Sequence, residues 1–153
     1  MPDLNVGRYF HSSCAFSNKT IFVFCGLENS SGYHGQDVNS IERYDFSQKQ
    51  KWELISIDES VFPVRSWPGA VQRDEQTILI FGGQQKGRRS DSYIFNINTL
   101  EVKQTMDLPK RIDMDQMPSF YDHKSKCIYA VFYHGGEVYK FDKDEKWTIC
   151  LKF

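Results

Sequence analysis

The sequence predicts an all-β protein built from a repeated unit, and two observations support this prediction. Short apolar runs rich in β-branched and aromatic residues alternate with turn residues along the chain, and no amphipathic segment of helix length separates them. One run, residues 77–83, recurs as residues 20–26 and, in a weaker form, as residues 127–133. The second residue of each run is isoleucine, and these isoleucines are separated by 57 and 50 residues.

These spacings are close to those of a four-stranded propeller unit, for which about 40–50 residues is usual. We therefore expect one domain, residues 1–153, that contains three four-stranded antiparallel units at about 7–57, 62–106 and 112–153. The expected strands are 8–16, 20–25, 40–45 and 51–55 in the first unit, 65–71, 77–81, 92–97 and 101–105 in the second, and 117–121, 127–133, 137–142 and 147–151 in the third.

The composition is that of an ordinary globular protein. Of its 153 residues, 40% are hydrophobic and 25% are charged, and the net charge is −1, which argues against disorder and gives no reason to expect a nucleic-acid partner. No apolar run approaches the roughly 18 residues that span a membrane, and the N-terminus lacks the apolar core of a secretory signal. The four widely spaced cysteines are interpreted as free thiols. A cytoplasmic protein without membrane association is expected.

The repeated unit resembles the kelch repeat family. The resemblance is carried by a first strand with Arg8, His11 and Ser12, by an apolar strand that ends in a glycine doublet, and by an aromatic–Asp pair followed by Trp. The last pattern occurs as Tyr44-Asp45 with Trp52 and as Phe141-Asp142 with Trp147, whereas Phe95-Asn96 with Val102 replaces it in the second unit. Two departures affect the doublet: Cys25 replaces its first glycine in the first unit, and Phe132-Tyr133 replaces it in the third.

The resemblance implies a kelch-type β-propeller of which three blades, half or part of a ring, are present. The residues expected to build the blades are Gly26, Tyr44, Trp52, Gly82, Gly83, Phe95, Phe141 and Trp147. The glycines are expected to adopt positive φ and to allow close backbone approach between packed sheets, and the aromatic side chains to be buried between neighbouring blades.

No catalytic or metal site is expected. His11, Ser12 and Ser13 are consecutive on a predicted strand, so successive side chains point to opposite faces and form no local nucleophile–base pair. His11 and Cys14 also face opposite ways, and the remaining histidines and cysteines lack the spacing of a structural zinc site. We therefore predict a protein that is not an enzyme and has no cofactor.

The loops are the expected binding surface, because kelch-like domains gather the loops between second and third strands and those between blades on one partner-binding face. Lys86, Arg88 and Arg89 place three cations on one short loop, and guanidinium groups bind carboxylates in a planar fork. An acidic peptide is the expected ligand; the alternative is a solvated loop tip. Other residues expected on this face are Tyr33, His34, Asp113 and His134, with Asp107 and Asp115 on the same rim.

Three blades leave an apolar face open at each end of the row, and such faces mark association. We expect a homodimer that closes the ring, a larger assembly, or a longer parent chain. The favoured function is a protein–protein interaction module that binds a protein partner as a scaffold or as part of a substrate receptor. The alternatives are a structural subunit that docks through its open blade faces and, less favoured, a propeller-type enzyme.

Overall fold

The computed structural model of the chain describes residues 2–16, 19–28, 35–48, 51–111, 118–132 and 135–153. These residues form strands and turns, and within them there is no helix, so the predicted all-β class is confirmed. Accordingly, the described residues contain no helix that could cross a membrane.

Sheet 1 has five strands. They are β1 (Arg8–Tyr9), β2 (Ser12–Phe16), β3 (Thr20–Glu28), β4 (Gln36–Asp45) and β5 (Glu53–Ile55). The strand order is β1-β3-β4-β5, and β2 also pairs with β3. The expected first strand, 8–16, is divided into β1 and β2 because Phe10 has a φ of 55°, a left-handed conformation that an extended strand does not accept.

Sheets 2 and 3 each have four strands in sequence order. Sheet 2 consists of β6 (Gly69–Gln72), β7 (Thr77–Phe81), β8 (Ser92–Asn96) and β9 (Val102–Gln104). Sheet 3 consists of β10 (Ser119–Asp122), β11 (Cys127–Phe132), β12 (Glu137–Phe141) and β13 (Trp147–Lys152). All neighbouring strands in the three sheets are antiparallel.

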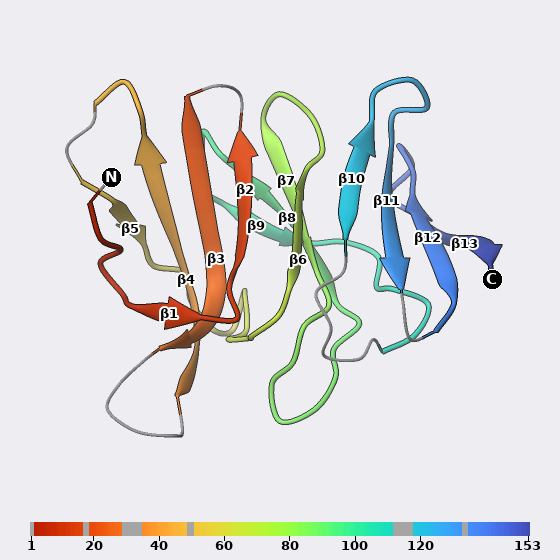
Figure 1. Ribbon diagram of the computed structural model, residues 1–153, viewed down its shortest axis with the longest axis horizontal. Coiled ribbons are helices and arrows are strands. Elements are labelled where there is room, and N and C mark those ends of the chain that lie inside the picture. The colour runs from red at the N-terminus through yellow and green to blue at the C-terminus, as the bar shows by residue number, and fades with distance from the viewer. Residues whose placement is uncertain (1, 17–18, 29–34, 49–50, 112–117, 133–134) are drawn as a thin grey trace.

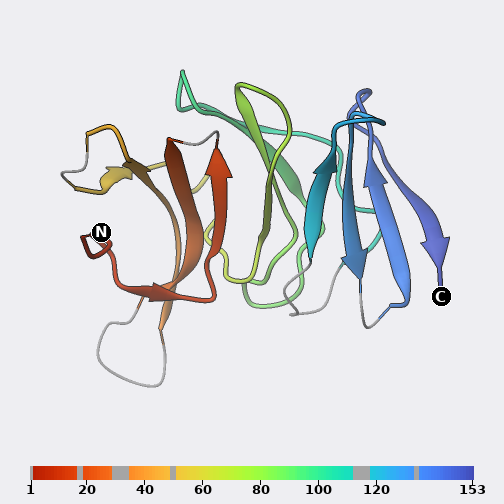
Figure 2. The same cartoon turned by 45° about the horizontal axis from the view of Figure 1, so that its top comes forward.

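The three sheets stand one after another, as Figures 1 and 2 show from two directions. Their strands β2, β6 and β10 lie side by side, and β6 contacts both of the others. The N-terminus lies on the far side of sheet 1, and the C-terminus lies on the far side of sheet 3. Among the described residues, the three sheets do not close into a ring.

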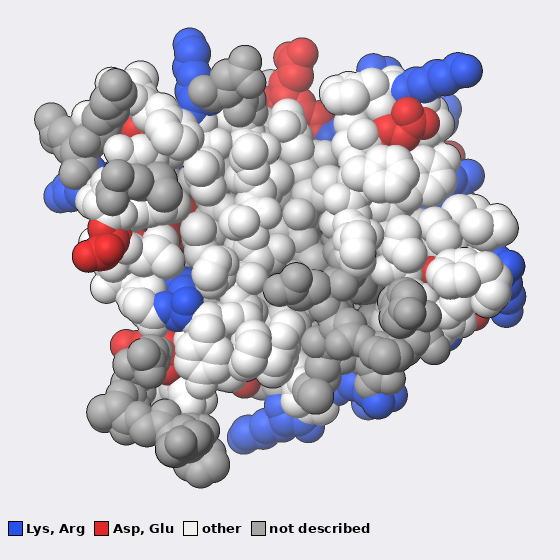
Figure 3. Space-filling view, viewed as in Figure 1, with Lys and Arg blue, Asp and Glu red and all other residues white. Residues whose placement is uncertain are grey.

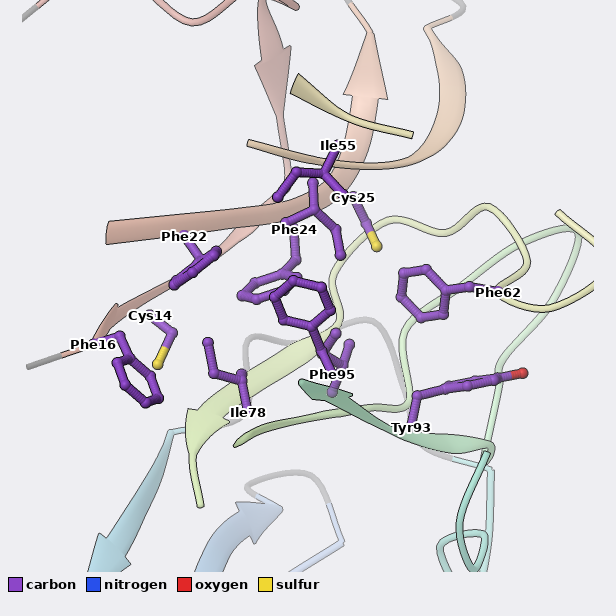
Figure 4. Close-up of a cluster of buried hydrophobic side chains, with 12 residues drawn as sticks. Cys14, Phe16, Phe22, Phe24, Cys25, Ile55, Phe62, Ile78, Tyr93 and Phe95 are labelled. Atoms are coloured by element: carbon purple, nitrogen blue, oxygen red, sulfur yellow. The ribbon is translucent and has the colours of Figure 1, made fainter. Parts of the chain in front are cut away.

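Aromatic side chains fill the space between consecutive sheets. Figure 4 shows Phe22 and Phe24 of sheet 1 pointing towards Phe95 of sheet 2, and their ring centroids lie 5.6 and 5.8 Å from that of Phe95. Between sheets 2 and 3, Trp147 lies 5.1 Å from Phe81. Burial of each such side chain contributes about 1.5–3 kcal/mol, so these contacts hold the sheets together.

The expectation that the Tyr and Trp of the first unit lie between sheets is wrong. Tyr44 and Trp52 are buried on the outer face of sheet 1, where Leu4 packs against them. The Trp52 Nε1 donates a hydrogen bond to the carbonyl of Pro2 at 3.0 Å. The N-terminal segment of the chain therefore covers these two rings.

The glycine doublet has the expected positive φ but a different close contact. Gly83 has a φ of 93°, and a Cβ there would lie 2.7 Å from the carbonyl oxygen of Ser66. Ser66 belongs to the segment that leads into sheet 2 itself, so the tight approach at Gly83 lies within one unit. At Gly26 the expected approach between units is present, because its amide donates to the carbonyl of Arg65 at 2.9 Å, in the segment that leads into the next sheet. Cys25 adopts a φ of 58°, close to the 62° of Gly82, although left-handed backbone costs a side-chain-bearing residue about 1–2 kcal/mol.

Candidate functional site

A buried ion pair lies beneath the loop that carries the predicted cations. Arg65 is fully buried, and its Nη2 lies 2.9 Å from Asp91 Oδ2. Its Nε donates to the carbonyl of Pro63 at 3.2 Å, and its Nη1 donates to the carbonyl of Gly82 at 3.1 Å. Because the guanidinium has a partner on every side, Arg65 fixes the segment before β6 to the end of β7 and the start of β8.

The same arrangement occurs in sheet 1. Arg8 Nε donates to the carbonyl of Val6 at 3.2 Å, its Nη1 donates to the carbonyl of Cys25 at 3.0 Å, and its Nη2 bonds Glu42 Oε1 at 2.7 Å. In sheet 3 a lysine pairs with the carboxylate, because Lys110 forms an ion pair with Glu137. Each unit thus has a cation–carboxylate pair, but Asp91 and Glu137 lie two residues before a tyrosine whose strand position Glu42 takes in sheet 1.

Asp91 also holds the loop residue Arg89. Arg89 donates from Nε and Nη2 to the two carboxylate oxygens of Asp91, both at 2.8 Å, and from Nη1 to Gln85 Oε1 at 2.9 Å. Burial alone raises the pKa of Asp91, but the hydrogen bond from Arg89 and the charge of Arg65 outweigh it and lower the pKa to about 2. Asp91 is therefore ionised at neutral pH and neutralised by two guanidinium groups.

The loop between β7 and β8 is compact because backbone hydrogen bonds close it. Gln84 exchanges two backbone hydrogen bonds with Ser66, at 2.8 and 2.9 Å, and the amide of Arg89 donates to the carbonyl of Gly83 at 2.9 Å. Lys86 occupies the turn with a φ of 48°. The tip of the loop is exposed while its base is fixed.

This loop forms one side of a hollow of about 350 Å³. Its lining consists of Gln85, Lys86, Gly87, Arg88, Arg89, Ser90, Asp91, Asp107 and Arg111, and we call it the basic hollow. The other side is the segment that joins sheets 2 and 3. That segment is held in place by buried Leu108, whose amide donates to the carbonyl of Ser90 at 2.7 Å.

The charge balance of the basic hollow is positive. Four cationic side chains, on Lys86, Arg88, Arg89 and Arg111, line it together with the acids Asp91 and Asp107, which leaves a formal charge of +2. Lys86 and Arg111 are exposed. Figure 3 shows Lys and Arg side chains along the lower edge of the molecule, where Figure 1 places the β7–β8 loop, whereas the face over β2, β6 and β10 is almost uncharged.

The three predicted loop cations line the basic hollow together with Asp107; they are Lys86, Arg88 and Arg89. Arg89 contributes least to an open binding surface, because Asp91 and Gln85 already occupy its guanidinium. The other residues expected on this face lie outside the described residues: Tyr33, His34, Asp113, Asp115 and His134.

Sequence reasoning missed Arg111. The signal was a short motif shared by consecutive units, since Pro63 precedes Arg65 by two residues as Pro109 precedes Arg111. The recurrence is one of sequence only, because Arg65 lies 13 residues before Ile78 and Arg111 lies 17 residues before Ile128, and Arg65 is buried whereas Arg111 is exposed.

A second hollow, of about 450 Å³, lies where strands β2, β6 and β10 begin. It is lined by His11, Ser12, Ser13, Trp67, Pro68, Ala70, Pro118 and Ser119. Trp67 stacks on Phe10 with ring centroids 3.9 Å apart, and both residues have positive φ. Burial lowers the pKa of His11, so this hollow is uncharged at neutral pH.

Within the described ranges, no three side chains of the metal-binding types converge. No hydrogen bond joins His11 to Ser12 or Ser13, although all three line the second hollow. The basic hollow is therefore the site whose chemistry specifies a ligand class, because clustered exposed cations favour anionic groups.

Comparison of the sequence with models of known protein families gives no match, and a search of curated proteins finds no significant relative. The class of protein is therefore defined by the fold and the site: an all-β chain of consecutive antiparallel sheets with a cationic hollow beside the second sheet.

Proposed function

We propose that this chain is a segment of a kelch-type β-propeller that acts as a non-enzymatic protein–protein interaction module. Three consecutive antiparallel sheets with their strands β2, β6 and β10 side by side support the propeller arrangement. In this role the chain serves as a scaffold or as part of a substrate receptor, and its ligand is an acidic segment of a partner protein.

The basic hollow is the observation that supports this proposal. Lys86 and Arg111 come from different segments, 25 positions apart in the sequence, yet both line it. Two exposed cations on opposite sides of a hollow fit a ligand with several carboxylates, and a guanidinium binds a carboxylate through two parallel hydrogen bonds. In the floor Arg65 and Arg89 are already paired with Asp91, so the exposed rim supplies most of the attraction.

Binding of a fluorescein-labelled glutamate-rich peptide, followed by anisotropy at low and high salt, tests the proposal. We expect binding that weakens as salt screens the charges, and a loss of about tenfold or more in affinity for the double variant Lys86→Glu, Arg111→Glu. Neither side chain takes part in the core, so the variant should keep its unfolding midpoint.

The matched control is the double variant Lys124→Glu, Lys126→Glu. Both lysines are exposed in the turn between β10 and β11, at the opposite end of the sheets, and the two substitutions make the same change of charge as the test variant. Its affinity should stay within about twofold of the wild type. Equal affinity in all three proteins, or equal binding of a lysine-rich peptide of the same length, would contradict the proposal.

A further inference from the structure

Sheet 3 has one face that no other part of the described chain covers. Its side chains come from alternate positions of the four strands and are mainly apolar. The larger ones are Phe120, Tyr129, Val131, Val138, Lys140 and Leu151, and we call them the outer face of sheet 3. Phe120 and Leu151 are each 55% exposed.

The corresponding face is covered in both of the other sheets. When the units are aligned on their shared isoleucine, Leu79 of sheet 2 takes the position of Tyr129, and it is 0% exposed because sheet 3 packs on it. Phe22 of sheet 1 takes the same position and is 1% exposed because sheet 2 packs on it. The molecule therefore shows twice what covers such a face, namely the opposite face of another four-stranded unit.

Lys140 is compatible with a covered face. Arg43 holds the equivalent position in sheet 1, on the face that packs on sheet 2, and it stays partly exposed at the margin. There its guanidinium forms an ion pair with Glu53 at 2.5 Å. A long cationic side chain at this position reaches solvent at the edge of the interface while its stem lies on apolar surface.

Sheet 1 carries the face that would complete such an interface. Its Ile21 and Tyr44 take the positions at which sheet 2 presents Ile78 and Phe95 to sheet 1. Tyr44 and Trp52 on this face are covered by residues 2–4, which the incoming sheet has to displace, whereas Ala15 of β2 is already exposed on the same face.

The N-terminal segment follows the path of an inter-sheet connection. The carbonyl of Val6 accepts a hydrogen bond from Arg8 Nε at 3.2 Å, just as the carbonyl of Pro63 accepts one from Arg65 Nε at 3.2 Å. Residues 58–64 join sheets 1 and 2 and leave those sheets packed together. Residues 5–6 therefore occupy a place that is compatible with a neighbouring sheet.

We infer that two copies of this chain associate head to tail, so that the outer face of sheet 3 in each copy packs on sheet 1 of the other. The result is a closed ring of six sheets with a twofold axis, in which both new interfaces repeat the two interfaces within the chain. Radial β-propellers contain about 4–8 sheets, a range that includes the six sheets of two copies and excludes the nine sheets of three copies. The inference rests on the propeller arrangement proposed above but not on the ligand of the basic hollow.

The mass of the full chain in solution, measured by light scattering after size exclusion and by native mass spectrometry, tests the inference. The expected species is a dimer of the 17.9 kDa chain. A wild-type protein that stays monomeric at micromolar concentration overturns the inference, and so does a series of larger, open-ended assemblies. Peptide binding by such a monomer would leave the proposed function standing.

Three variants test the geometry. Val138→Lys alters the outer face of sheet 3. Ala15→Lys alters the exposed part of sheet 1. Ala15 holds the position that Tyr121 holds in sheet 3, where Tyr121 packs on the core between sheets 2 and 3. The control, Val61→Lys, changes an exposed valine in the connection between sheets 1 and 2. We expect monomers from the first two and a dimer from the control, each with an unchanged far-ultraviolet spectrum. A dimer that tolerates Ala15→Lys but not Val138→Lys would join two outer faces to each other and would overturn the ring.

Discussion

Replacing three arginines one at a time by methionine should give a graded loss of stability. Arg8 and Arg65 each form a buried guanidinium–carboxylate pair, whereas Arg43 pairs with Glu53 at the surface. Methionine keeps much of the side-chain volume and removes the charge. The loss of stability then depends on the carboxylate that remains, because a buried charge without a counter-charge strongly destabilises the fold.

The order follows from the other partners of each carboxylate. In Arg8→Met, Glu42 stays fully buried with hydrogen bonds from Asn5 and the Val6 amide but with no second cation among the described residues. We expect a loss of about 4–5 kcal/mol in the free energy of unfolding. In Arg65→Met, Asp91 keeps Arg89, and we expect about 3 kcal/mol. Arg43→Met should cost less than about 1 kcal/mol.

Equilibrium unfolding in urea measures the three values, and an unchanged dependence on urea concentration shows that the variants unfold from the same fold. A domain of this kind has a total stability of about 5–15 kcal/mol, so Arg8→Met is the variant most at risk of not folding. In that case the double variant Arg8→Met, Glu42→Gln should recover much of the stability, because it removes the stranded charge. Equal losses in all three single variants, or the reverse order, would refute this reasoning.

Two further predictions concern titratable groups. Because the folded-state pKa of Asp91 is lowered to about 2, its ion pairs stabilise the fold above the ordinary carboxyl pKa and lose that contribution, about 2 kcal/mol, as pH falls from about 4 to 2. About half of it is lost at pH 3, so urea titrations at pH 7 and pH 3 should show a drop of about 1 kcal/mol from this group in the wild type and a smaller total drop in Asp91→Asn. Burial raises the pKa of the Cys25 thiol to about 12 and that of the Cys14 thiol to about 11, whereas Cys150 is exposed. Iodoacetamide at pH 8 should therefore modify Cys150 in the native protein and reach Cys14 and Cys25 only after unfolding. Peptide mass mapping measures which cysteines are labelled. Early labelling of Cys25 would contradict its place in the core.

The local sequence pattern predicted the strands and the turns of the fold. Period-two alternation and turn residues indicated the strands, and the glycine doublet indicated a left-handed turn, which Gly82 and Gly83 adopt. The break at Phe10 was not foreseen, because a bulky residue disfavours the left-handed region and only its contact with Trp67 accounts for it. The cover over Trp52 was also missed, since it depends on where the first residues of the chain settle after folding.

Only part of the candidate site could be predicted from the local sequence. The run of cations on one loop is visible in the sequence. The pairing of Arg89 with Asp91 is not, because it depends on the folded structure, in which Arg65 and Arg89 both bind the same buried carboxylate. Arg111 joins the hollow only because Leu108 anchors its segment beside the loop. Contacts between segments far apart in the sequence thus separate the cations that hold the loop from those that face solvent.

The exchange of a cation in the third unit shows how a repeat can gain a new surface property. In the first two units an arginine is committed to the interior, as Arg8 and Arg65 are. In the third, Lys110 pairs with the internal carboxylate Glu137, and the neighbouring Arg111 lies at the surface, where it lines the basic hollow. Where a lysine takes the internal pairing, the arginine beside it stays available to meet a ligand.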